Sequence, residues 1–191
     1  RYANLRNHRK LLLIDGSLGF TGGMNIRRGH AETADPTLAI TDLQFRIEGP
    51  VVGQMRETFI EDWRFASDET LAGDAWEPAL APAGEILARG IASGPDEAEA
   101  MERVRWAMQG ALSQAQAQVR IVTPYFLPDS PLMSELALAS MRGVSVDILI
   151  PERNNLRLVE WASLAKIGYL LARGCRVWRT APPFDHSKAM T

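Results

Sequence analysis

Apolar residues follow two spacings along the chain, and the spacing changes several times between its ends. A continuous apolar run at 11–14 stops at Asp15-Gly16, which predicts a buried strand and a turn, and 18–20 would return beside that strand. Alternating apolar and polar residues at 43–48 predict a half-buried strand. Apolar residues then recur at helical spacing over 51–66, so this segment is predicted to be an amphipathic helix.

Beyond residue 85 the same patterns predict a regular alternation of strands and helices. Strands are predicted at 86–92, 119–123, 144–150 and 176–179, and helices from the Ser93-Gly94-Pro95-Asp96 turn to Leu112, at 132–141 and at 156–172. This alternation is typical of an α/β lobe, in which helices cover a sheet. Three tryptophans lie on apolar helix faces, where core packing is the expected role: Trp63, Trp106 and Trp161.

Two segments lack such patterns. Residues 27–36 are polar and predict a loop, in which His30 is expected to be exposed. Residues 74–85 hold prolines and a glycine among alanines, and we predict a lobe at 1–74, a linker at 75–84 and a second lobe at 85–191. The chain begins at Arg1 without an initiator Met and stops inside a predicted strand, so we expect a fragment in which both lobes are incomplete.

Composition narrows the class of protein. The chain has 191 residues, of which 46% are apolar and 23% charged, so it can bury a core and fold as a globular protein. A net charge of -2 disfavours a nucleic-acid-binding protein. The single Cys175 cannot form an intrachain disulfide and is expected to be a small buried residue. The sequence contains no apolar stretch of the roughly 20 residues that a transmembrane helix needs.

One short segment carries groups that could do chemistry. His8 and Lys10 lie two residues apart in an extended segment, so both side chains point to the same side. That side presents a nucleophile or a base beside a fixed cation. Asp15 has the opposite parity and is expected to brace the motif instead of acting on a substrate.

A second His-x-Lys unit lies near the other end of the chain, at His186-Ser187-Lys188. Two copies of one unit, far apart in the sequence, are consistent with two lobes that each donate half of one site. No cluster of cysteines or carboxylates with the spacing of metal ligands accompanies either unit, and two lysines would repel a divalent cation. We therefore predict no metal and no cofactor.

These residues resemble the HKD motif of the phospholipase D superfamily. The first copy is complete: His8-x-Lys10-xxxx-Asp15 is followed by Gly22-Gly23-Met24-Asn25. The second ends at Thr191, before its Asp and Asn. Segments 45–51, 61–63, 93–96 and 123–129 resemble landmarks of bacterial cardiolipin synthases in their usual order. The resemblance implies two phospholipase D-like α/β/α lobes that face each other across one active site.

The resemblance also implies a role for each residue. His8 would attack phosphorus to form a phosphohistidine, and His186 would be the general acid and base. Non-bridging oxygens would be held by Lys10, Lys188 and Asn25. Asp42 stands where family members carry an acidic residue that orients the nucleophilic imidazole. Asp15, Gly22 and Gly23 would be structural, and Tyr125 would either line the substrate site or pack.

The implied activity is phosphatidyl transfer of the cardiolipin synthase type, which converts phosphatidylglycerol to cardiolipin and glycerol. Two alternatives stay open, namely hydrolysis of a phospholipid or nucleic-acid phosphodiester, and a degenerate lobe that serves as a membrane-associated scaffold. The implied partners are phospholipid, a membrane surface and an alcohol acceptor such as phosphatidylglycerol, with no nucleic acid and no obligate protein partner. A bacterial cell membrane is the expected location. We expect these residues in isolation to be inactive, because the second motif is cut short.

Overall fold

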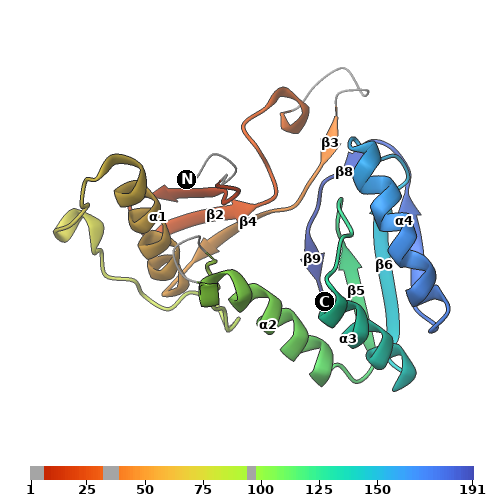
Figure 1. Cartoon of the computed structure of the whole chain (residues 1–191). Coiled ribbons are helices and arrows are strands. Elements are labelled where there is room, and N and C mark those ends of the chain that lie inside the picture. The colour runs from red at the N-terminus through yellow and green to blue at the C-terminus, as the bar shows by residue number, and fades with distance from the viewer. Residues whose placement is uncertain (1–6, 32–38, 94–97) are drawn as a thin grey trace. The chain divides into compact units, whose positions relative to one another are not determined.

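The computed structural model describes residues 7–31, 39–93 and 98–191, which form two compact units of mixed α/β structure (Figure 1). The first unit comprises Arg1–Gly22 and Gln44–Arg103, and the second comprises Gly23–Leu43 and Val104–Thr191. Residues 23–43 group with the second unit because a short strand within them pairs near the carboxyl end of the chain. The lobes at 1–74 and 85–191 stay a prediction, since the compact units divide the chain elsewhere.

The first unit contains a three-stranded antiparallel sheet in the order β1-β2-β4. The strands are β1 (Leu11–Ile14), β2 (Leu18–Gly22) and β4 (Gln44–Glu48). Between β1 and β2, Ile14 O accepts a hydrogen bond of 3.2 Å from Ser17 N. Asp15 and Gly16 both have positive φ, 50° and 63°, as a tight turn of this hairpin type requires. The predicted strands and turn are present, and Asp15 lies in the turn itself. The predicted burial of the strands is wrong, since Leu12, Ile14 and Phe45 are 56%, 40% and 51% exposed.

Helix α1 (Val51–Ser67) covers this sheet and matches the predicted helix. Its buried side chains are Val52 and Met55. A Cβ atom added at Gly19 on β2 would lie 2.8 Å from the Met55 sulfur, so the glycine allows the helix to approach the sheet closely. A short 3-10 helix, η2 (Asp74–Trp76), follows α1.

The second unit contains a four-stranded sheet in the order β7-β6-β5-β9. Its central strands β5 (Gln118–Val122), β6 (Ser145–Pro151) and β7 (Arg176–Thr180) are parallel, and β9 (Ala189–Met190) pairs antiparallel with β5. The crossovers are α3 (Ser130–Met141) and α4 (Arg157–Leu171). Because both crossovers join neighbouring parallel strands in the same direction, right-handed connections put both helices on one face, as Figure 1 shows.

The core of the second unit lies between this sheet and its helices. Helix α2 (Ala98–Gln114) contributes Leu112, which is fully buried. The other buried apolar side chains come from the parallel strands and from the inward faces of α3 and α4, and include Val119, Ile121, Leu136, Val146, Ile148, Ile167 and Leu170. Cys175 is buried among them, as predicted, and burial raises the pKa of its thiol.

Several predictions of local structure need correction. Residues 86–92 form no strand, and the tryptophans predicted to pack in the core, Trp63, Trp106 and Trp161, are 41%, 49% and 60% exposed. The helix start predicted at 93–96 lies mostly outside the described residues, as does the second half of the predicted loop at 27–36. The described part of that loop contains a short 3-10 helix, η1 (Arg28–His30).

Candidate active site

Two short parallel strands of the second unit bring together residues that are far apart in the sequence. Strand β3 (Ile40–Thr41) pairs with β8 (Phe184–Asp185), with Thr41 opposite Asp185. The next residues along these strands are Asp42 and His186. The pairing continues there, since His186 N donates a hydrogen bond of 2.7 Å to Thr41 O. The register of the strands therefore places the carboxylate beside the imidazole.

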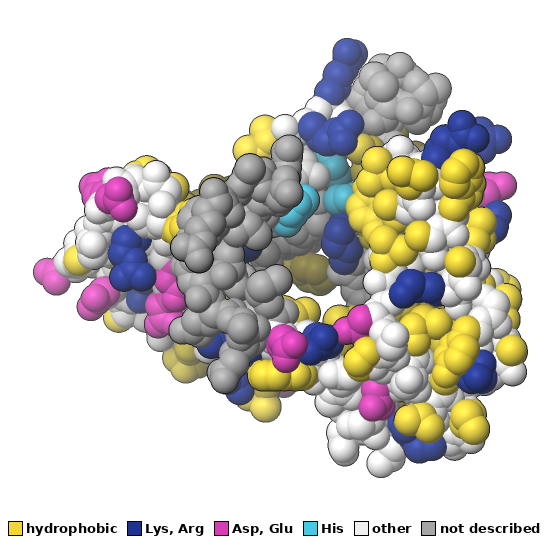
Figure 2. Space-filling view, in the orientation of Figure 1, with side chains coloured by type: hydrophobic (Ala, Val, Ile, Leu, Met, Phe, Trp, Pro, Cys, Tyr) yellow, Lys and Arg dark blue, Asp and Glu magenta, His cyan; other side chains and the backbone are white. Residues whose placement is uncertain are grey.

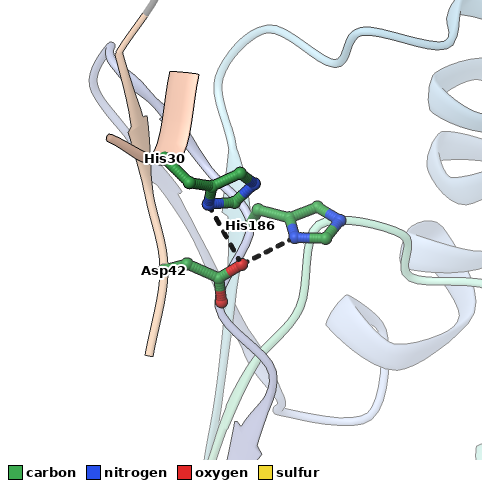
Figure 3. Close-up of side chains that lie close together, drawn as sticks. All are labelled: His30, Asp42 and His186. Atoms are coloured by element: carbon green, nitrogen blue, oxygen red, sulfur yellow. Dashed lines mark hydrogen bonds and ion pairs between the residues drawn. The ribbon is translucent and has the colours of Figure 1, made fainter. Parts of the chain in front are cut away.

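The Asp42 carboxylate and the His186 ring form a buried hydrogen-bonded pair (Figure 3). The Asp42 Oδ2 to His186 Nδ1 distance is 2.8 Å, and the side chains are only 1% and 14% exposed. A buried carboxylate at Nδ1 favours the tautomer with a proton on Nδ1, which leaves the lone pair of Nε2 available. This arrangement would allow His186 Nε2 to accept a proton.

Lys188 brings a positive charge to the same ring. Its Nζ lies 3.0 Å from Nδ1 and 3.2 Å from Nε2 of His186, and it also donates to the His186 carbonyl oxygen. The ammonium group is thus held next to the nitrogen that would face a substrate. A cation in this place can neutralise an anionic phosphate oxygen that approaches the imidazole.

His30 completes the cluster, which is a correction to its predicted exposure. Its side chain is 3% exposed, and its ring meets the His186 ring edge to face at 5.8 Å. The His30 Nδ1 atom lies 3.8 Å from Asp42 Oδ2, too far for a hydrogen bond, and this buried nitrogen has no hydrogen-bond partner among the described residues. Burial lowers the pKa of His30, and the Asp42 carboxylate opposes this effect.

A phenylalanine substitution tests this description of His30. Because burial lowers its pKa, His30 takes up a proton at a lower pH in the folded wild-type protein than in the unfolded chain, where a histidine has a pKa of about 6.5. The unfolded state therefore binds more protons as the pH falls below that value, and stability is lost. His30→Phe keeps a ring in this space and removes the titration. Thermal unfolding between about pH 7 and pH 5 should therefore show a smaller fall in Tm for the variant. Equal falls would contradict the assignment.

The absence of a side chain at Gly23, the second glycine of the first motif, leaves room for the Asp42 carboxylate. A Cβ atom at Gly23 would lie 2.1 Å from Asp42 Oδ1, so no larger residue fits while the carboxylate holds its position. The Gly23 N–H also donates to Leu43 O at 3.0 Å, next to Asp42 in the chain. Gly22 is the last residue of β2 and leads the chain to this point. Asn25, two residues beyond Gly23, belongs to the second unit and is exposed.

Aromatic rings surround the remaining sides of His186. The Tyr125 and Phe184 rings lie 5.9 Å and 6.1 Å from it, and the Tyr125 hydroxyl donates to Asn155 Oδ1 at 3.0 Å. Tyr125, predicted either to line the site or to pack, therefore contacts the imidazole itself. Sequence reasoning did not single out Phe184, although its position two residues before His186 on a strand was an available signal.

The His8-x-Lys10 part of the first motif lies in the other unit, next to α1. His8 is exposed, and the residues on either side of it, Asn7 and Arg9, both donate hydrogen bonds to the Asp62 carboxylate, at 2.8 Å and 2.5 Å. Lys10 Nζ donates to the His8 carbonyl oxygen at 2.6 Å. The helix therefore fixes the backbone around His8 and leaves its imidazole accessible.

The two His-x-Lys units share a local conformation. In each unit, the side-chain oxygen of the residue before the histidine accepts a hydrogen bond from the backbone N–H two residues later. Asn7 Oδ1 accepts from Arg9 N at 2.8 Å, and Asp185 Oδ1 accepts from Ser187 N at 2.9 Å. Each lysine also folds back onto the carbonyl oxygen of its own histidine. The same side-chain turn therefore presents both histidines.

His30, Asp42 and His186 could also serve as metal ligands on geometry alone, since each offers one atom and these lie within 4.8 Å of one another. However, the Nδ1 atom of His186 already bonds to Asp42, and the Lys188 ammonium lies 3.0 Å from that nitrogen. A divalent cation would have to displace both. The geometry therefore favours a proton-transfer site over a metal centre.

Comparison with known proteins agrees with the resemblance that the motifs carry. Residues 108–191 match the family model described as "Cardiolipin synthase, PLD-like domain". The chain is 33% identical to the probable cardiolipin synthase YwiE of Bacillus subtilis and 36% identical to cardiolipin synthase A of Pseudomonas fluorescens Pf-5, over 98% of its own length in both cases. It spans 37% and 38% of those proteins.

A solved structure shares the fold. The crystal structure of phosphatidylserine synthase from Haemophilus influenzae matches 96% of this chain and 51% of its own, with a TM-score of 0.58 and 15% identity. Among the described residues, none of the helices has the length and apolar character to span a bilayer. Together the motif residues and these sequence matches make the chain similar to the bacterial cardiolipin synthases along 98% of its length, and to their PLD-like domain over residues 108–191.

Proposed function

We propose that the protein transfers phosphatidyl groups by cardiolipin synthase chemistry, with His186 as the proton-transferring group. The observation that carries the proposal is the buried 2.8 Å hydrogen bond between Asp42 and His186, with the Lys188 ammonium beside the same ring. A buried carboxylate stabilises the imidazolium that forms when a histidine takes up a proton. His186 is therefore placed to give a proton in one step of the reaction and to take one in the other.

The reaction has two displacements at phosphorus. In the first, an imidazole nitrogen of His8 forms a P–N bond, the P–O bond to the leaving glycerol breaks, and the His186 imidazolium protonates the departing oxygen. In the second, His186 takes the proton of an acceptor hydroxyl, whose oxygen attacks phosphorus and releases His8. With phosphatidylglycerol as donor and acceptor, the products are cardiolipin and glycerol.

Lysines neutralise the phosphate in this scheme, in place of a metal ion. Lys10 and Lys188 lie two residues from their histidines and fold back along the same segment, so each motif carries its own cation. Asn25 would donate a further hydrogen bond to a non-bridging oxygen. Because the charge grows in the transition state, fixed donors of this kind lower the barrier more than they tighten substrate binding.

The experiment is a product assay on the full-length protein with phosphatidylglycerol vesicles and a chelator. Transfer yields cardiolipin and glycerol in equal amounts, whereas hydrolysis, the second candidate, yields phosphatidic acid. The buried Asp42–His186 pair serves either reaction, and only the acceptor differs. A scaffold module would give neither product. Phosphatidic acid as the main product would replace the proposal with a phospholipase, and absence of both products would overturn it.

A further inference from the structure

The outward face of α4 is apolar and uncovered among the described residues. Leu158 and Trp161 are 76% and 60% exposed, and further apolar side chains on the helix or at its start are at least two-fifths exposed: Leu156, Leu164, Tyr169 and Leu171. In Figure 2, hydrophobic side chains gather over the part of the second unit that carries α4 in Figure 1. Apolar surface of this extent on a single helix marks an interaction site.

This helix is apolar on its other side as well. Ser163, Ile167 and Leu170 face the sheet and are buried. A helix with polar residues on its free side would need no further partner, whereas one that is apolar all round normally lies inside a protein or in contact with lipid. The sequence pattern therefore leaves the outward face of α4 in need of an apolar environment.

Positive charges mark both ends of this face. The Arg157 guanidinium lies 5.8 Å from the Trp161 ring in the first turn, and that of Arg173 lies 3.5 Å from the Tyr169 ring just past the last turn. Residues 152–173 contain four cations and two carboxylates, although the whole chain carries a net charge of -2. Aromatic rings with arginines at their edges are typical of segments at the boundary between lipid tails and anionic head groups.

The amino-terminal end of this helix lies near the candidate site. Asn155, one residue before Leu156, accepts a hydrogen bond of 3.0 Å from the hydroxyl of Tyr125, whose ring contacts His186. A bilayer on this face would therefore hold lipid head groups close to the proton-transferring histidine. This proximity favours a lipid surface over a protein partner.

We propose that the exposed face of α4 docks the protein on an anionic phospholipid bilayer. The proposal rests on the proposed function in one respect, because a phosphatidyltransferase must meet its substrate at a membrane surface. The apolar side chains would enter the boundary of the acyl chains, while Arg157 and Arg173 would reach the phosphates.

The test is flotation of the 191-residue chain with vesicles of phosphatidylglycerol and phosphatidylcholine. The double variant Leu158→Glu, Trp161→Glu should partition at least about tenfold more weakly onto phosphatidylglycerol vesicles, since it removes two large apolar groups from the contact. Arg157→Glu with Arg173→Glu should lower binding mainly at low salt. As a matched control, Ile86→Glu with Leu87→Glu changes two exposed apolar residues of the first unit and should bind like the wild type.

Each outcome decides the matter. Equal partitioning of the α4 double variant and the wild type would overturn the proposal. Failure of the wild-type chain to bind vesicles would also overturn it. This includes the case in which the wild-type chain self-associates through α4 and the double variant is monomeric. Turnover of phosphatidylglycerol in detergent micelles by the full-length wild-type protein is measured separately. Turnover without vesicle docking through α4 refutes the docking surface alone, and docking without turnover refutes the proposed function.

Discussion

Replacing His186 with asparagine is expected to lower kcat for phosphatidyl transfer by about 10²- to 10⁴-fold, the usual contribution of a general acid and base. Asparagine can still donate a hydrogen bond to the buried Asp42 carboxylate, so the fold should be retained. The measurement is the rate of cardiolipin formation from phosphatidylglycerol by the full-length protein, with thermal unfolding to confirm a wild-type Tm.

A change of leaving group separates proton transfer from a structural effect. A phosphatidyl ester of p-nitrophenol releases a stable phenolate and needs no acid in the first displacement. The His186→Asn variant should therefore release the first equivalent of p-nitrophenol almost as fast as the wild type. An equal loss of rate on both substrates would show that His186 has another role.

Asp42→Asn should have the second largest effect. The amide has the size of the carboxylate but cannot stabilise an imidazolium, and it can present the wrong hydrogen-bonding group to His186 Nδ1. In a serine protease the corresponding change costs about 10⁴-fold in kcat, and a loss of about 10²- to 10⁴-fold is expected here. The measurement is kcat for cardiolipin formation by the full-length variant, with thermal unfolding to confirm a wild-type Tm.

Two further variants bracket this result. Asp185→Asn makes the same chemical change one residue before His186, but its side-chain oxygen can still accept from Ser187 N, so activity should stay within about threefold. Gly23→Ala leaves Asp42 in the sequence but forces its carboxylate away, since the new Cβ would lie 2.1 Å from Asp42 Oδ1. It should lose much of its activity. A fully active Gly23→Ala or Asp42→Asn protein would contradict the role of the pair.

Sequence patterns predicted where the elements lie better than which side chains they bury. The strands at 11–14 and 43–48 and the helix at 51–66 are present close to their predicted bounds, but neither strand has a buried side chain, and Leu12 and Phe45 are 56% and 51% exposed. The helix at 156–172 was also found, but the predicted apolar face with Trp161 is the exposed one. An all-round apolar helix has no periodicity that identifies its buried side. The segment at 86–92 has apolar residues but no partner strand among the described residues.

The candidate site was predicted as a set of residues, and its connections were not. His186, Lys188 and Asp42 followed from the motif resemblance, and Asp42 was assigned to the nucleophilic imidazole. In the structure Asp42 bonds to His186, because β3 and β8 pair in a register that nothing local in the sequence specifies. The burial of His30 depends on the same pairing, and a polar neighbourhood in the sequence gave no sign of it.

The central chemical claim is a covalent intermediate on His8, resolved with the help of His186. The direct measurement is mass spectrometry of the full-length His186→Asn variant, quenched with alkali shortly after mixing with the p-nitrophenyl ester, because a phosphohistidine survives alkali better than acid. A phosphatidyl adduct on the peptide that contains His8 is expected, and the His8→Ala variant should show none. An adduct on any other residue, or release of p-nitrophenol by the variant with no adduct at all, would contradict it.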